Sequence, residues 1–171
     1  YIIKKMKFSV NQKDLQQSLG YCQGVIEKRS TLPILSNILI EAHDSKLKIT
    51  ATDLDLIFVN EIQNVEVIEE GKTTTTSSTL YDIIRKFSSG KKINFNLTSE
   101  NKIQIESEKS VFNLNCMSAT EFPLTDENFN ENEFTINAKQ FLKLLNKCKF
   151  SISNDETRHY LSGIYIHQNH I

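Results

Sequence analysis

The stretch that decides the fold is FSVNQKDLQQSLGYCQGVI, residues 8–26, because residues 134–152, FTINAKQFLKLLNKCKFSI, follow the same pattern. The two copies are 126 positions apart, and this register continues without a gap over 40 positions, from Met6–Ser45 onto Asn132–Ile171. Polar residues match as well as apolar ones, and the identical pairs include Phe8 and Phe134, Asn11 and Asn137, Lys13 and Lys139, and Cys22 and Cys148. A gapless repeat of this length predicts one structural unit of about 126 residues, followed by roughly a third of a second unit.

The repeat also predicts the domain organisation of the chain. Residues 1–5 are interpreted as an upstream extension, because Met6-Lys-Phe8 is typical of a natural start. Residues 6–126 are expected to form a first domain, and residues 127–171 the N-terminal part of a second, truncated one. The second copy stops at a predicted strand, 163–167, that would lack its neighbours and expose unpaired backbone groups. We therefore expect the N-terminal fragment of a longer protein.

Composition excludes several classes of protein. The chain has 171 residues, of which 39% are hydrophobic and 24% charged, and its formal net charge is −1. These values are typical of a globular protein rather than a disordered tail. No apolar run approaches the roughly 20 residues of a membrane span, and residues 1–5 lack the features of a signal peptide. The three cysteines have neither disulfide nor zinc spacing, which is typical of the reducing cytoplasm, and we expect no membrane partner.

Hydrophobic periodicity predicts an α+β architecture in which two amphipathic helices pack on one face of a largely antiparallel sheet. The first helix is expected to run from an N-cap at Asn11 to about Glu27, and the second over Leu80–Ser89 after a cap at Ser78 or Thr79. The predicted strands of the first unit are Lys7–Val10, Ile34–Ala42, Lys46–Asp53, Leu56–Val67, Thr73–Ser77, Lys92–Leu97, Lys102–Glu106 and Ser110–Met117. The elements predicted for the second copy are a strand at Glu133–Ile136, a helix at Asn137–Lys149 and a strand at Gly163–His167.

Cations gather on the predicted helices although the whole chain is nearly neutral. The third helix alone contains Lys139, Lys143, Lys147 and Lys149, whereas the acids lie mainly elsewhere. Such a face is either an ordinary solvated helix surface or a surface for DNA phosphates. A DNA-binding protein of this kind is either a regulator that reads sequence or a protein that holds any duplex.

Three stretches of the sequence resemble one known family. They are residues 6–40, which contain RSTLPIL at Arg29–Leu35, residues 47–56, which read LKITATDLDL, and residues 150–163, which begin FSISNDETR. Together they are similar to the bacterial DNA polymerase III beta subunit, the sliding clamp, over Met6–Ile166. The resemblance implies three consecutive DNA-clamp-like domains and a head-to-tail homodimer that closes into a ring around duplex DNA. It implies a replicative processivity factor that is not an enzyme.

The resemblance also implies DNA contacts that carry no sequence information. The residues at matching positions or on matching basic helices are Arg29, Arg85, Lys86, Lys143, Lys147, Asn154, His159 and Tyr160. The chain departs from the family where Asp155 places a carboxylate near the expected path of DNA, and where His159 replaces a tyrosine. Two alternatives stay open, because Arg29 could tie down its own loop and Tyr160 could belong to the rim of the core.

Two protein interfaces follow from the resemblance. Arg158 and Leu161 match residues lining a pocket for short peptides of the DNA polymerase III alpha subunit, the clamp loader and other clamp-motif proteins, although Leu161 could equally be a core residue. Lys109, Phe112 and Leu114 match the edge that pairs with the third domain of a second subunit. The alternative for this edge is an ordinary strand whose apolar side packs on its own sheet.

No catalytic constellation, cofactor motif or metal site is predicted. Asp53 and Asp55 are paired carboxylates beside a predicted strand turn, and we interpret them as structural. The alternative is an enzyme that uses both with a metal ion, and it predicts metal-dependent turnover. His167 and His170 have the spacing H-x-x-H but no third ligand.

Overall fold

The computed structural model describes residues 5–26, 32–99, 101–123, 135–155 and 157–167. The chain divides into two compact units, Tyr1–Thr125 and Asp126–Ile171, and each is described here by itself. Arg29, a predicted DNA contact, lies outside the described residues, as does the first half of the predicted strand Glu133–Ile136.

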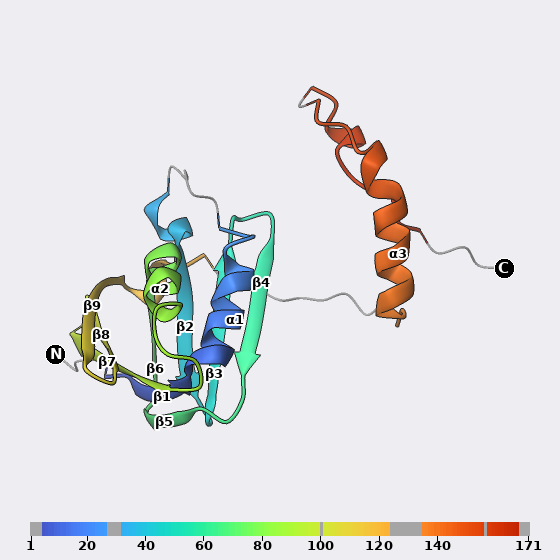
Figure 1. Ribbon diagram of the computed structural model, residues 1–171. Helices are drawn as coiled ribbons and strands as arrows, with labels where there is room; N and C mark the ends of the chain where they lie inside the picture. The colour runs from blue at the N-terminus through green and yellow to red at the C-terminus, as the bar shows by residue number, and fades with distance from the viewer. Residues whose placement is uncertain (1–4, 27–31, 100, 124–134, 156, 168–171) are drawn as a thin grey trace. The chain divides into compact units, whose positions relative to one another are not determined.

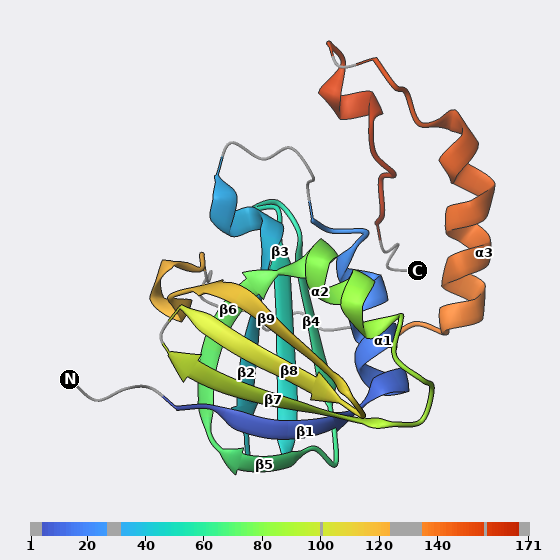
Figure 2. The same ribbon diagram turned by 60° about the vertical axis from the view of Figure 1, so that its left-hand side comes forward.

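The described residues of the first unit form one nine-stranded sheet with antiparallel neighbours throughout, in the order β4-β3-β2-β6-β9-β8-β7-β1-β5. The strands are β1 (Lys7–Asn11), β2 (Asn37–His43), β3 (Lys46–Thr52), β4 (Ile57–Ile62), β5 (Glu66–Glu69), β6 (Gly71–Thr76), β7 (Lys92–Ser99), β8 (Lys102–Ser107) and β9 (Ser110–Met117). Figures 1 and 2 show this sheet curving around the helices α1 (Gln12–Cys22) and α2 (Ser77–Ile84). The predicted α+β architecture, with two helices on an antiparallel sheet, is confirmed.

The first unit contains a shorter repetition that the sequence analysis missed. The order strand, helix and three strands occurs as β1-α1-β2-β3-β4 and again as β6-α2-β7-β8-β9. The two halves exchange neighbours, because β1 pairs with β7 and β2 pairs with β6. The two helices therefore lie side by side, and the Gln12 Nε2 amide donates a hydrogen bond to the Ile84 carbonyl oxygen across them (3.0 Å).

Local sequence signals place the helix starts. The Asn11 side chain accepts a hydrogen bond from the Lys13 amide (2.9 Å), which confirms the predicted N-cap of α1. The helix α3 (Ala138–Cys148) of the second unit is capped in the same way by Asn137. The helix α2 starts three residues before the predicted Leu80 and ends at Ile84, well before the predicted Ser89. Its N-cap, Thr76, makes no side-chain capping bond, so the capping pattern used for the prediction was misleading there.

Three predicted strands are wrong in part or altogether. Residues 33–36 form a short 3-10 helix, η1 (Pro33–Ser36), so β2 begins at Asn37 rather than Ile34, because proline at its first position favours a helical turn. The predicted strand Leu56–Val67 is two strands, β4 and β5, separated where Asn64 adopts a positive φ of 59°. Residues 163–167 form no strand, since no described residue of the second unit pairs with them.

The core of the first unit lies between the sheet and the helices. Phe8 and Phe95 stack there at a centroid distance of 4.7 Å, and the buried faces of α1 and α2 contribute Leu15, Leu19, Leu80 and Ile84. A smaller cluster, formed by Leu39, Ala119 and Phe122, includes the residues around the short helix η2 (Ala119–Glu121). This packing positions the C-terminal end of α2, where the candidate residues Arg85 and Lys86 lie.

Candidate nucleic-acid interface

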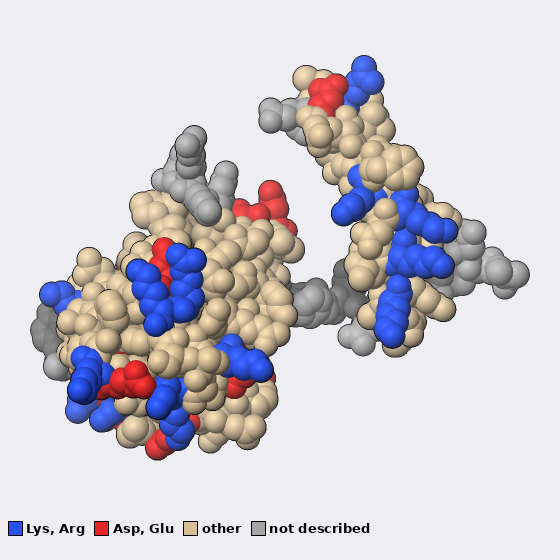
Figure 3. Space-filling model, viewed as in Figure 1, with Lys and Arg blue, Asp and Glu red and all other residues tan. Residues whose placement is uncertain are grey.

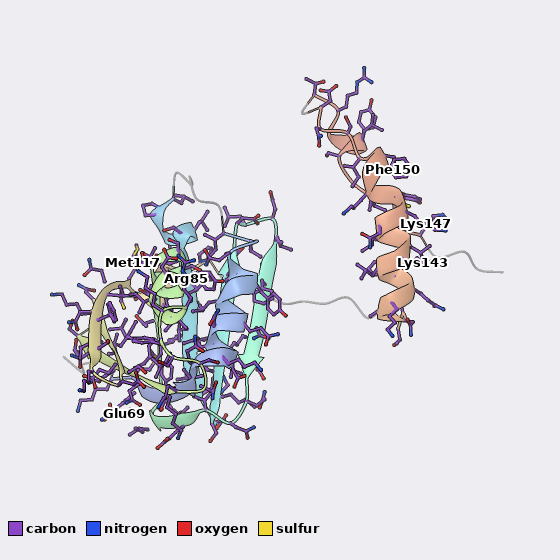
Figure 4. The ribbon with its side chains drawn as sticks, in the orientation of Figure 1. Glu69, Arg85, Met117, Lys143, Lys147 and Phe150 are labelled. Atoms are coloured by element: carbon purple, nitrogen blue, oxygen red, sulfur yellow. The ribbon has the colours of Figure 1, made fainter. Side chains whose placement is uncertain are left out.

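Arg85 and Lys86 extend from the C-terminal end of α2. Arg85 is the C-cap residue of this helix, and both side chains are exposed. The buried residues Leu80 and Ile84 hold the opposite side of the helix in the core. Figure 4 shows Arg85 on this helix, and Figure 3 shows cationic atoms over the same face with acidic atoms between them. The structure thus presents two neighbouring cations on the helical side of the first unit.

The acidic atoms beside Arg85 belong to a residue that the sequence analysis missed. The Asp82 Oδ1 atom lies 3.1 Å from the Arg85 Nη2 atom, three residues along the same helix. The spacing i, i+3 is the signal that could have found this pair, since residues three apart on a helix are neighbours. Lys86 has no ion pair among the described residues.

The helix α3 carries a second group of cations. Lys139, Lys143 and Lys147 are four residues apart and lie on one side of the helix. Figure 4 shows Lys143 and Lys147 on this helix, and Figure 3 shows cationic atoms along it. The sequence of α3 contains no acid, and none of the three lysines has an ion pair among the described residues. The arrangement is a continuous cationic surface suited to a row of phosphates.

The loop after α3 contains the remaining predicted DNA contacts. Asn154 is exposed, and Tyr160 is 82% exposed within the short helix η4 (His159–Leu161). His159 is the first residue of that helix. The Ser153 amide donates to the Leu161 carbonyl oxygen (2.9 Å), which closes the loop. The described structure thus places Tyr160 at the surface.

Asp155 has a structural role in this loop. Its Oδ1 atom accepts hydrogen bonds from the hydroxyl (2.6 Å) and the amide (3.0 Å) of Thr157. These two bonds, with the hydroxyl contributing most, lower the pKa of the Asp155 carboxyl. Its Oδ2 atom lies 3.5 Å from the Arg158 Nε atom. The carboxylate that departs from the family pattern is therefore occupied within its own loop.

The predicted peptide-pocket residues are both at the surface of the second unit as described. Arg158 is exposed, and its backbone amide donates to the Asp155 carbonyl oxygen (3.1 Å). Leu161 is 43% exposed, whereas its repeat partner Leu35 is 4% exposed. The two repeat positions thus differ in environment, although the sequences match.

The edge strand β9 contains the predicted dimer contacts. It pairs with β8 along Ser110–Asn115, but with β6 only through Cys116 and Met117, so most of its other edge is open. Phe112 is 37% exposed and meets Phe87 edge-on at a centroid distance of 5.8 Å. Leu114 packs against the main core, and Lys109 is exposed. The open edge and Phe112 are available to a partner, while Leu114 is largely used by its own unit.

The carboxylates and the buried thiol that could suggest catalysis have structural surroundings. The Asp53 Oδ1 atom accepts hydrogen bonds from the amides of Asp55 (3.1 Å) and Leu56 (2.7 Å), which shapes the turn before β4. Burial raises the pKa of the Cys22 thiol to about 12, so this thiol stays protonated near neutral pH. Within the described residues, no three His, Cys, Asp or Glu side chains gather as a metal site would need. No described helix is long and apolar enough to span a membrane.

The curved antiparallel sheet with helices on its inner face and cations on those helices is the domain architecture of a DNA sliding clamp. The family description "DNA polymerase III beta subunit, N-terminal domain" matches residues 6–126. The chain belongs to this family.

Similarity to individual clamps extends into the second unit. The chain is 34% identical over 164 residues to the beta sliding clamp of Caulobacter vibrioides strain NA1000 / CB15N, covering 95% of this chain and 44% of that protein. It is 33% identical over 159 residues to the beta sliding clamp of Escherichia coli strain K12, covering 93% and 43%. The crystal structure of a DnaN sliding clamp from Bartonella birtlesii bound to griselimycin matches with a TM-score of 0.92 at 35% identity, covering 98% and 44%. The chain thus spans less than half the length of these relatives.

Proposed function

We propose that this chain is the N-terminal part of a ring-forming sliding clamp, a processivity factor that encircles duplex DNA during replication. The observation that carries the proposal is the match to the Bartonella birtlesii clamp over 98% of the chain, across both units. Residues 6–126 would form the first clamp domain, residues 127–171 would begin the second, and residues 1–5 would be an upstream extension. In this role the protein would act in the bacterial cytoplasm as a non-catalytic accessory subunit of the polymerase.

Contacts to phosphate explain how such a ring holds DNA and still moves along it. Lysine and arginine neutralise phosphates without reading bases, so every position along a duplex is nearly equivalent. The proposed contacts are Arg85 and Lys86 on α2, Lys143 and Lys147 on α3, together with Arg29, Asn154, His159 and Tyr160. The α3 lysines are exposed and form no ion pair with any residue that the structure describes, which supports this assignment.

The open edge of β9 supports a head-to-tail homodimer. A strand from a second subunit would satisfy the backbone groups that β6 leaves unpaired along Ser110–Leu114. Phe112 would supply the main apolar contact, with Leu114 and Lys109 beside it.

Peptide-bearing proteins are the further proposed partners. Arg158 and Leu161 would line part of a pocket for segments of the DNA polymerase III alpha subunit, the clamp loader and other clamp-motif proteins. The exposure of both residues in the second unit supports this role. The relative from Bartonella birtlesii was crystallised with griselimycin bound, which shows that a clamp of this family holds a ligand.

The proposal is tested by asking whether the protein stays on circular DNA because it encircles it. The full-length protein is loaded onto a nicked circular plasmid with its clamp loader, and the complex is isolated by gel filtration. Cutting the plasmid once should release the protein, and blocking both new ends should retain it. A DNA-binding regulator would stay bound after the cut and would prefer particular sequences. Metal-dependent turnover that is lost in D53N and D55N would instead support the enzyme alternative.

A further inference from the structure

The two cations at the end of α2 are held differently. The guanidinium of Arg85 forms an ion pair with Asp82 at 3.1 Å, and the side chains are 53% and 56% exposed, respectively. Lys86, the next residue, has no ion pair among the described residues. The group of three side chains therefore has a net charge of +1 instead of +2, and its arginine already has an anionic partner.

Helix stability does not explain this aspartate. Asp82 lies in the last turn of α2, where the negative end of the helix dipole disfavours a carboxylate. Arg85, at the C-cap, interacts favourably with the same dipole without any help from Asp82. Exposed ion pairs of this kind contribute little to folding. The position of Asp82 therefore requires another explanation.

The second described arginine shows the same arrangement. Arg158 lies 3.5 Å from Asp155, which is also three residues before it, whereas the lysines of α3 are without ion pairs among the described residues. Arginine binds phosphate through two parallel hydrogen bonds with fixed geometry, while lysine acts as a mobile point charge. A directional contact opposes movement along DNA more than a point charge does. Among the proposed DNA contacts that the structure describes, Arg85 has a carboxylate partner, whereas Lys86, Lys143 and Lys147 have no ion pair.

We propose that Asp82 is a positioning residue that restrains Arg85, so that the guanidinium makes only a weakened and rapidly exchanged contact with DNA phosphate. The inference rests on the proposed clamp function and adds a residue to its DNA-facing surface. The Asp82 carboxylate competes with each phosphate for the same Arg85 donors. When a phosphate leaves, the carboxylate pairs with the guanidinium again. Asp82 would thus favour sliding over static binding.

The test uses D82N in the full-length protein. Binding to a short linear duplex is measured by fluorescence anisotropy at several salt concentrations, and diffusion on long DNA is measured for the loaded ring. We expect D82N to bind the linear duplex about twofold to fivefold more tightly, the range of an exposed ion pair. Its salt dependence should become steeper by up to about 0.9 in the logarithmic slope, one additional phosphate contact. Diffusion along DNA should become slower.

Matched variants separate the restraint from a general charge effect. D14N removes the same charge from an exposed site at the start of α1, away from any arginine ion pair, and should leave DNA affinity unchanged. D82E retains a carboxylate three residues before Arg85 and should behave as the wild type. In an R85Q background, D82N should have no further effect on affinity or salt slope.

The outcomes distinguish the inference from the proposed function. If R85Q weakens DNA binding and D82N does not tighten it, the restraint is wrong while the clamp function stands. If R85Q has no effect, Arg85 is not a DNA contact and the inference is wrong with it, although the plasmid-release experiment still tests the clamp function independently. If D14N tightens binding as much as D82N, the effect is one of net charge, and the specific role of Asp82 is refuted.

Discussion

At the scale of single residues, the exposed ion pair of Glu66 and Lys92 connects two strands that are not neighbours in the sheet. Glu66 in β5 and Lys92 in β7 are separated by β1, and the Lys92 Nζ atom donates to the Glu66 Oε2 atom at 2.9 Å. This hydrogen bond, and then the charge of Lys92, lower the pKa of the Glu66 carboxyl. Because both side chains are more than half exposed, the pair contributes little to the stability of the fold.

The pair predicts a pH dependence. Since the folded state lowers the pKa of Glu66, the ion pair stabilises the fold above the ordinary pKa of glutamate. That contribution is lost as the pH falls through the lowered pKa. In K92Q, an NMR titration should show the Glu66 pKa returning to its ordinary range, and the stability difference from the wild type should vanish in acid. K102Q, which removes a lysine without an ion pair among the described residues, should leave the Glu66 titration unchanged.

At the scale of elements, the junction of β6 with β9 depends on threonines. Only two residue pairs connect these strands, Thr74 with Met117 and Thr75 with Cys116. The Thr74 hydroxyl donates to the Met117 carbonyl oxygen (3.0 Å), and the Thr75 hydroxyl donates to the Asn115 carbonyl oxygen (3.0 Å). Side-chain hydrogen bonds thus extend a short ladder, and they connect the strands β4-β3-β2-β6 with the strands β9-β8-β7-β1-β5.

Thr74→Val tests this connection. The Thr74 hydroxyl is buried and also accepts a hydrogen bond from the Asn37 side-chain amide (3.2 Å), so valine leaves a buried amide and the partly buried Met117 carbonyl without this partner. We expect a loss of about 1–3 kcal/mol in the free energy of unfolding, measured by urea denaturation. Thr79→Val makes the same chemical change at an exposed position of α2 and should be nearly neutral. Equal stability of the two variants would contradict the role of the threonines.

At the scale of the whole molecule, the proposed homodimer depends on the open edge of β9. Truncating Phe112 to alanine in the full-length protein should raise the dimer dissociation constant at least about tenfold, because large aromatic side chains dominate interfaces. Analytical ultracentrifugation measures this change. Thermal unfolding shows separately how much the lost contact with Phe87 destabilises the unit. I68A removes an exposed apolar side chain from β5, away from β9, and should leave the dimer intact.

Most of what was correctly predicted from the sequence is local. Asn11 caps its helix as predicted, because a cap needs only the next two or three residues, and Asn137, predicted as the first residue of its helix, is the cap there. The strands β7, β8 and β9 follow from alternation in adjacent residues. The family assignment also came from contiguous motifs, and the match to the family description over residues 6–126 confirms it.

Tertiary structure alone decided how these elements combine. The break at Asn64 directs β5 away from β4, and β5 then pairs with β1, more than fifty residues earlier in the chain. The threonines of β6 connect the two parts of the sheet that meet at β6 and β9 only because folding brings Asn115 and Met117 beside them. Sequence by itself determined the periodicities, caps and motifs, since these depend on neighbouring residues. Strand partners and the surroundings of each side chain depend on long-range packing, which adjacent residues do not encode.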